Sequence, residues 1–199
     1  LGQFKNSEKA FSNAIGASGG SAELYANRSD LFRQMEAFER AIRDCNLAIK
    51  MNRNLPAAYG NLAAIQIDLG EWLQAEQALR TAIKLDSKNA SFYINLSKTM
   101  IALQRPDEAL EVALDALRLE PTSSHAINAL ANSYLYKSEF YQAELLYRQA
   151  LELEPRNIDV LNNLGTALAQ QNNFSEAYNN YTTALHLDTN RADILTNLG

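Results

Sequence analysis

Apolar residues recur along the chain at steps of three and four positions, and the whole pattern repeats with a period of roughly 34 residues. In one repeat, Ala75, Leu79 and Ala82 follow the short steps. Such steps place apolar side chains on one side of a helix, whereas a strand would need strict alternation. Each repeat carries two such stretches separated by a short turn, as at Leu69-Gly70-Glu71. The pattern therefore predicts one pair of amphipathic helices per repeat.

Two rows of small residues mark the repeat most clearly, because no insertion or deletion breaks their spacing. Two helices pack closely where one presents a small residue and the other a large one. One hairpin cannot bury its apolar face alone, so neighbouring hairpins must stack to form the core. The first row is Ala14, Ala48, Ala82, Ala116, Ala150 and Ala184, and the second is Ser7, Ala41, Ala75, Ala109, Ala143 and Ala177.

The register of these rows gives the organisation of the chain. Pro56 and Pro106 indicate helix starts, where the missing N–H costs nothing, and Pro121 and Pro155 indicate helix ends. We expect an all-α solenoid of antiparallel helix hairpins, forming a single array over residues 1–199. Both ends fall within a unit, so we expect this chain to be part of a longer array. The expected parts are the second helix of a partial repeat (1–21), full repeats at 22–55, 56–89, 90–123, 124–157 and 158–191, and the start of a further repeat (192–199).

The repeat resembles that of the tetratricopeptide repeat (TPR) family, over the whole chain. The unit 124–157 shows the family pattern as Tyr134, Ala143, Tyr147 and Ala150, followed by Pro155. The resemblance implies a right-handed superhelix whose first helices line a concave groove. It also implies a protein–protein interaction scaffold that binds an extended peptide or protein segment there.

Composition and charge argue against several classes of function. The net charge is −5 with no long basic run, which argues against nucleic acid as a partner, since such binding rests on clustered Lys and Arg. No apolar run reaches the ~20 residues of a membrane span, and no secretory signal is visible, so we expect a cytoplasmic protein. No catalytic set, metal-ligand spacing or phosphate loop occurs. We therefore expect no enzyme activity from the chain itself, and no cofactor or metal.

A row of asparagines at the same spacing is the most informative polar feature. Asparagine is a poor residue for a helix interior, because its amide competes with the backbone. Two interpretations remain open: the amides hold the backbone of a peptide, or each bonds a neighbouring helix. The row resembles the asparagine ladder in the TPR domain of O-linked GlcNAc transferases. It consists of Asn27, Asn61, Asn95, Asn163 and Asn197, and only Ala129 interrupts it.

Further candidates for peptide binding lie midway along the expected groove. Apolar side chains rimmed by amides are a plausible anchor for one or two side chains of a partner. The alternative is that several of them pack against the adjoining repeat, which we favour for Ile67 and Ile101. The remaining candidates are Ile94, His125, Asn128, Leu135, Tyr136 and Asn162.

Two other functions stay open beside the peptide-binding scaffold. The chain is alternatively the substrate-recruiting arm of a larger enzyme, such as a glycosyltransferase, as the asparagine row suggests. It is alternatively a self-associating structural scaffold, because an uncapped terminal unit exposes an apolar face that would stack end to end.

Overall fold

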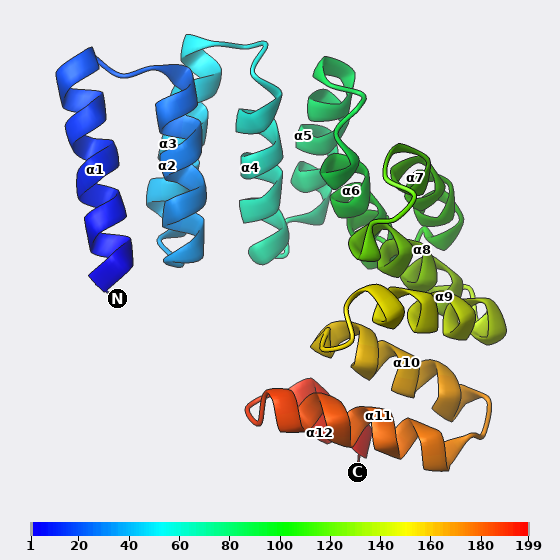
Figure 1. Ribbon diagram of the computed structural model, residues 1–199. Coiled ribbons are helices and arrows are strands. Elements are labelled where there is room, and N and C mark those ends of the chain that lie inside the picture. The colour runs from blue at the N-terminus through cyan, green and yellow to red at the C-terminus, as the bar shows by residue number, and fades with distance from the viewer. Residues whose placement is uncertain (1, 199) are drawn as a thin grey trace. The chain divides into compact units, whose positions relative to one another are not determined.

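Helices make up all the regular structure in the part of the chain that is described. The computed structural model describes the backbone of residues 2–198, and the side chains of all of these except residues 2, 3, 5 and 18. Figure 1 shows the helices in order. They are α1 (Gly2–Ser18), α2 (Ala22–Gln34), α3 (Phe38–Met51), α4 (Pro56–Asp68), α5 (Trp72–Leu85), α6 (Ala90–Ala102), α7 (Pro106–Leu119), α8 (Ser124–Tyr136), α9 (Phe140–Leu153), α10 (Ile158–Gln170), α11 (Phe174–Leu187) and α12 (Ala192–Leu198).

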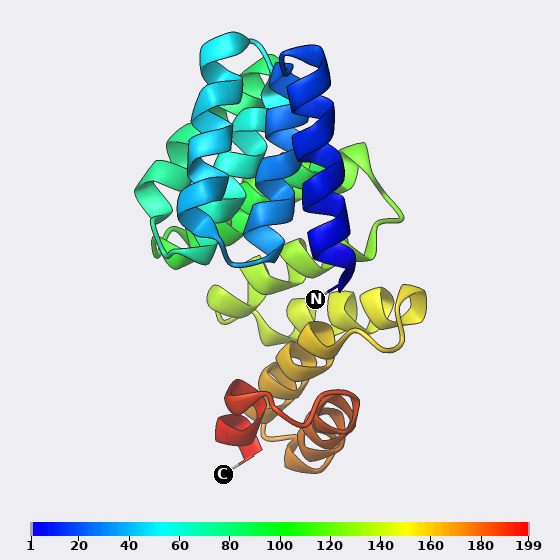
Figure 2. The same ribbon diagram turned by 90° about the vertical axis from the view of Figure 1, so that its left-hand side faces the viewer.

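The chain forms two compact units, and the division falls within α6, between Thr99 and Met100. In unit 1, α2 pairs with α3 and α4 pairs with α5, while α1 packs against α2 (Figure 1). In unit 2, α8 pairs with α9 and α10 with α11, while α7 packs against α8 and α12 against α11 (Figure 2). Each pair is an antiparallel hairpin of consecutive helices, which confirms the predicted all-α hairpin fold.

The first helix of each hairpin begins at the residue that the sequence register places first. Consecutive first helices start one period apart, at Ala22, Pro56, Ala90, Ser124 and Ile158. Pro56 and Pro106 occupy the first turns of α4 and α7, as predicted. The continuity of the repeats as one array remains a prediction.

The predicted small rows lie in the cores of the hairpins. From Ala48 onward, every alanine of the first row is fully buried, and Ala41, Ala75, Ala109 and Ala143 of the second row are buried equally. A methyl group at these places lets the backbones of the two helices approach, and any larger side chain would have to displace a neighbour.

The turn within each hairpin has one residue in the left-handed backbone region, at the same place in every unit. Only Gly70 among them is a glycine, with φ of 74°. The other turns hold a non-glycine residue there at some cost in conformational energy. These residues are Glu36, Gln104, Ser138 and Asn172.

Candidate functional site

The first helices of the hairpins approach one another more closely than the second helices do. In unit 1, α2 contacts α4 directly, and in unit 2, α8 contacts α10. Among the described residues, the corresponding pairs of second helices, α3 with α5 and α9 with α11, make fewer such contacts. Side chains on adjacent first helices therefore come within hydrogen-bonding reach. In each unit we call the surface formed by the first helices its first-helix face. It includes Asn27 and Asn61 in unit 1, and, separately, Asn128, Asn132, Tyr136, Asn163 and Asn197 in unit 2.

In unit 1, the asparagine row bonds the preceding first helix. Asn61 is half-buried, and its Nδ2 donates to the carbonyl oxygen of Ala26 at 2.8 Å. A carbonyl only accepts, so this bond fixes which way the Asn61 amide is turned and leaves its Oδ1 available. Asn27 is exposed and Asn95 is half-buried. The hydroxyl of Thr99 donates to the backbone carbonyl of Asn95 at 2.8 Å, so this bond does not involve the side-chain amide of Asn95.

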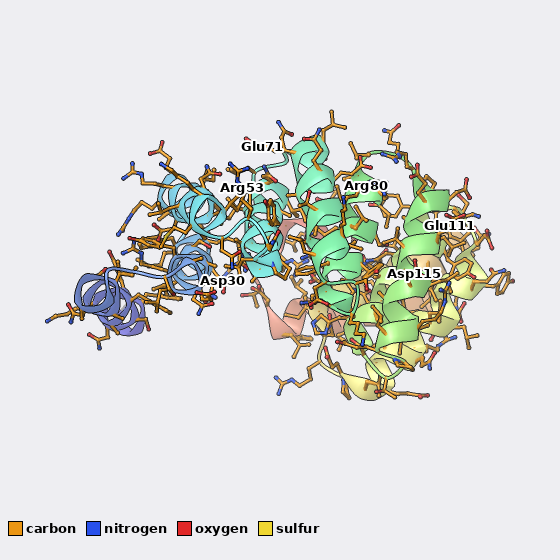
Figure 3. The ribbon with its side chains drawn as sticks, turned by 90° about the horizontal axis from the view of Figure 1, so that it is seen from above. Asp30, Arg53, Glu71, Arg80, Glu111 and Asp115 are labelled. Atoms are coloured by element: carbon orange, nitrogen blue, oxygen red, sulfur yellow. The ribbon has the colours of Figure 1, made fainter. Side chains whose placement is uncertain are left out.

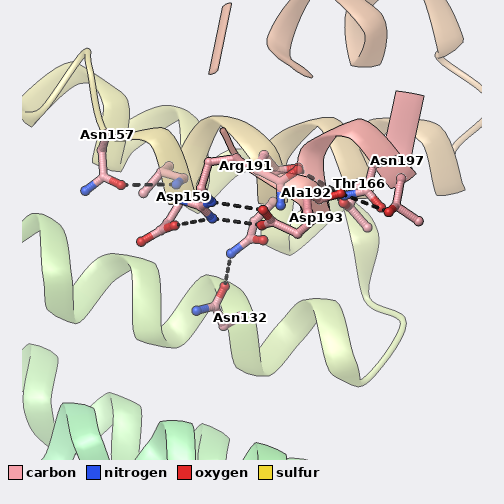
Figure 4. A network of polar contacts seen from close by, with 12 residues as sticks. Asn132, Asn157, Asp159, Thr166, Arg191, Ala192, Asp193 and Asn197 are labelled. Carbon is pink, nitrogen blue, oxygen red and sulfur yellow. Dashed lines mark hydrogen bonds and ion pairs between the residues drawn. The ribbon is translucent and has the colours of Figure 1, made fainter. Parts of the chain in front are cut away.

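In unit 2, the row joins a wider polar network, drawn in Figure 4. The oxygen Oδ1 of Asn132 accepts two hydrogen bonds, from the hydroxyl of Tyr147 at 2.6 Å and from Nδ2 of Asn163 at 3.0 Å. Burial raises the pKa of Tyr147 well above its ordinary value, which keeps the phenol protonated as a donor. Asn132 was missed by the sequence analysis.

A comparison of equivalent positions in successive repeats could have identified Asn132. The hydroxyl of Tyr181, one period after Tyr147, bonds Oγ1 of Thr166 at 3.2 Å. Thr166 likewise lies one period after Asn132, so both repeats pair a buried tyrosine with a polar residue 15 positions earlier. The signal is therefore a polar row opposite a tyrosine row, which single-helix patterns do not show.

The last member of the row bonds the preceding first helix in the same way. Nδ2 of Asn197 donates to Oδ1 of Asn162 at 3.0 Å. Asn197 is exposed, whereas Asn162 is buried, with 8% exposure. The structure thus brings Asn162 and Asn197 together and gives Asn162 a bonding role within the protein. Bonds to a neighbouring helix, one of the two interpretations left open, are present at Asn61, Asn163 and Asn197.

The other candidates differ in exposure. Tyr136 exposes 63% of its surface at the end of α8. Leu135 is partly buried against the core of unit 2. His125 is exposed, with Nδ1 at 3.7 Å from a carboxylate oxygen of Glu154. Tyr136 is therefore the member of this group with a large free apolar surface on α8.

Two candidates of the expected anchor lie in unit 1. Ile94 is half-buried on α6. Ile67 is buried, with 7% exposure, and its packing against the adjoining repeat stays a prediction. Asn128, on α8 of unit 2, is half-buried, and its Oδ1 is buried without a hydrogen-bond partner.

In each unit, one arginine forms ion pairs with two carboxylates of the first helices. Arg33 bridges Asp30 at 3.2 Å and Asp68 at 2.9 Å in unit 1. Figure 3 shows Asp30 among the charged side chains that extend from the helices. In unit 2, Arg191 bridges Asp159 and Asp193, each at 2.8 Å, as Figure 4 shows. Each of these places holds two carboxylates and one guanidinium, so the arginine offsets one of the two negative charges.

Arg191 also lowers the pKa of the Asp193 carboxyl, mainly through their hydrogen bond. Within the described residues, no group of His, Cys, Asp and Glu is arranged to hold a metal ion. In the same part of the chain, no helix has both the length and the apolar character needed to cross a membrane.

Comparison with known families identifies the family to which the repeat is similar. Three sequence models described as tetratricopeptide repeat match residues 22–55 and 124–157, 66–133, and 146–179. Together these ranges cover most of the chain. No curated protein matches the sequence.

Several solved structures share the fold. The crystal structure of YrrB, described as a TPR protein with an unusual peptide-binding site, has a TM-score of 0.66 and 19% identity, over 95% of this chain and 97% of that one. TTC0263, a TPR protein of Thermus thermophilus, has a TM-score of 0.78 and 22% identity, over 89% and 97%. A chain of the Cut9–Hcn1 assembly of APC/C has a TM-score of 0.90 and 21% identity, over 98% of this chain but 39% of that one. At these identities the likeness shows the fold alone.

Proposed function

Because the chain belongs to the tetratricopeptide repeat family, we propose that it is an interaction scaffold that binds an extended peptide or protein segment along its first-helix face. The observation that carries the proposal is the row of asparagine amides at one position of successive first helices. An unpaired peptide backbone needs both donors and acceptors, and a carboxamide supplies both.

The bond that Asn61 makes within the protein is compatible with this proposal. Asn61 donates one N–H to Ala26 and retains its carbonyl oxygen. That bond fixes the amide before a partner arrives, which lowers the entropy lost on binding. The asparagines would then contact the backbone of the partner, and Tyr136 would contact one of its apolar side chains.

Two likenesses are consistent with this function. A structure of the same fold, YrrB, is described as having a peptide-binding site. The asparagine row also resembles the asparagine ladder in the TPR domain of O-linked GlcNAc transferases, and we propose that it has a similar role here. We further propose a cytoplasmic location and a binding role without catalysis for this chain.

The test uses peptides selected on the wild-type chain from a random display library. Their affinities are then measured by fluorescence anisotropy for a variant with Asn61, Asn95 and Asn163 replaced by Ala. The matched control replaces three exposed amides of the second helices, Gln142, Gln149 and Asn179, by Ala.

We expect the first-helix variant to lose at least tenfold in affinity, which is about 1.4 kcal/mol, and the control to bind like wild type. Circular dichroism must show both variants folded, since Asn61 and Asn163 also bond neighbouring helices. Unchanged affinity in the folded first-helix variant would remove the asparagine row from the mechanism.

A further inference from the structure

One buried acceptor on the first-helix face of unit 2 has no donor. It is Oδ1 of Asn128. The residue at the same place in the next repeat, Asn162, accepts from Asn197, which lies 35 positions further along. The same offset from Asn128 leads to Asn163. The repeat therefore places a suitable donor beside Asn128, yet the bond is not made.

Asn163 instead donates to Asn132, one helical turn beyond Asn128 on α8. Asn132 already accepts a shorter bond from Tyr147, at 2.6 Å. Its oxygen thus receives two donors, while the oxygen of Asn128 receives none. A buried acceptor without a donor has lost water and gained no bond in exchange, which makes this arrangement costly.

We propose that Asn132 Oδ1 receives a main-chain N–H of the bound partner, and that Asn163 then turns its amide from Asn132 to Asn128. This inference rests on the proposed function. A carbonyl oxygen has two lone pairs, so the hydroxyl of Tyr147 keeps one and the partner takes the other. Nδ2 of Asn163 then fills the empty acceptor of Asn128, in the register already seen at Asn197 and Asn162.

The number of satisfied hydrogen-bond acceptors is higher in the bound state than in the free state. Before binding, Asn132 has two donors and Asn128 has none. After binding, Asn132 still has two and Asn128 has one. The N–H of the partner is the added donor, so one buried polar atom is satisfied on association. The site therefore selects a partner segment with an unpaired backbone N–H, which an extended chain offers and a proline at that position does not.

The decisive experiment is an N-methyl scan of the library-selected peptides, in which each backbone N–H is replaced in turn. For the wild-type chain, we expect methylation at one position to weaken binding by about fivefold to tenfold, the worth of one hydrogen bond. In Asn132→Ala, the same methylation should change affinity less than about twofold. Asn128→Ala should weaken the unmethylated peptide while keeping the sensitivity to methylation, and Gln142→Ala serves as the exposed amide control.

A second measurement needs no peptide. In a crystal structure of Asn132→Ala, Nδ2 of Asn163 should lie within hydrogen-bonding distance of Oδ1 of Asn128. An Asn163 amide that stays away from Asn128 there would overturn the inference. Equal sensitivity to methylation in wild type and Asn132→Ala would overturn it as well. Peptides unaffected by the triple asparagine variant would instead overturn the proposed function, and this inference with it.

Discussion

The guanidinium of Arg28 holds the buried carboxylate of Asp44 through two hydrogen bonds, Nε to Oδ2 at 2.6 Å and Nη2 to Oδ1 at 2.9 Å. The side chain of Asp44 is only 5% exposed. Arg28 also lies over the rings of Tyr25 and Phe32, with its Cζ at 5.4 and 5.3 Å from their centroids. The hydrogen bond to Asp44 raises the pKa of Arg28. The hairpin α2–α3 therefore depends on an ion pair where the next repeat has Leu62 and Ala78.

Replacing one member of this pair should destabilise unit 1. Arg28→Leu leaves the Asp44 carboxylate buried without its partner, and removal of one member of a buried pair costs about 3 kcal/mol. Thermal and urea unfolding would measure the loss. The double variant Arg28→Leu/Asp44→Ala copies the residues of the next repeat and should recover most of it. A double variant as unstable as the single one would contradict this account.

Gly60 provides a second test of packing in unit 1. A Cβ built on Gly60 would lie closer to a ring carbon of the buried Phe92 than van der Waals contact allows. Gly→Ala within a helix normally stabilises by about 1 kcal/mol, but here the ring must move, so we expect Gly60→Ala to destabilise by about 1–3 kcal/mol. Gly16, in α1, has nothing within 4 Å of such a Cβ, and Gly16→Ala should be neutral or stabilising. Urea unfolding of both variants decides the point, and a stabilised Gly60→Ala would refute the predicted contact.

Cys45 should make the stability depend on pH in the alkaline range. The thiol is fully buried, and burial raises its pKa from 9.0 to about 11. Below the unfolded-state pKa, the thiol is protonated in both states and has no effect. Between pH 9.0 and about 11, the unfolded chain loses the proton first, so the thiol lowers the free energy of unfolding as pH rises.

The control for this effect is Cys45→Ala, which retains every other titrating group. The wild type should lose stability more steeply than the variant above pH 9.0, as urea unfolding at several pH values would measure. Thiol reagents should also label Cys45 only as fast as the protein opens. Parallel stability curves for the two proteins would rule out a buried thiol with a raised pKa.

The period of the sequence was sufficient to predict the hairpins and their cores. Ala48 and Ala82 are small residues in an invariant register, and the structure buries both completely. Backbone packing of this kind follows from spacing alone, because each repeat faces the same neighbours. The starts of α4 and α7 at Pro56 and Pro106 follow from local backbone chemistry in the same way.

The polar contacts could not be predicted from the spacing of residues in the sequence. Asn163 and Asn197 share one register, yet the first bonds a residue 31 positions earlier and the second a residue 35 positions earlier. A rotation about side-chain bonds decides between these acceptors, and spacing carries no record of it. Arg28 and Asp44 are likewise 16 positions apart on two helices, and either one alone reads as an ordinary charged residue.

The central claim, that partners bind the first-helix face, is tested most directly by photo-crosslinking from two matched tyrosines. Tyr136 on α8 and Tyr141 on α9 are 63% and 77% exposed. Each is replaced in turn by p-benzoylphenylalanine, and the library-selected peptides are added and irradiated. Our account predicts a crosslink from position 136 that unlabelled peptide competes away, and none from position 141. A specific crosslink from position 141 without one from position 136 would place binding on the second helices and contradict the account.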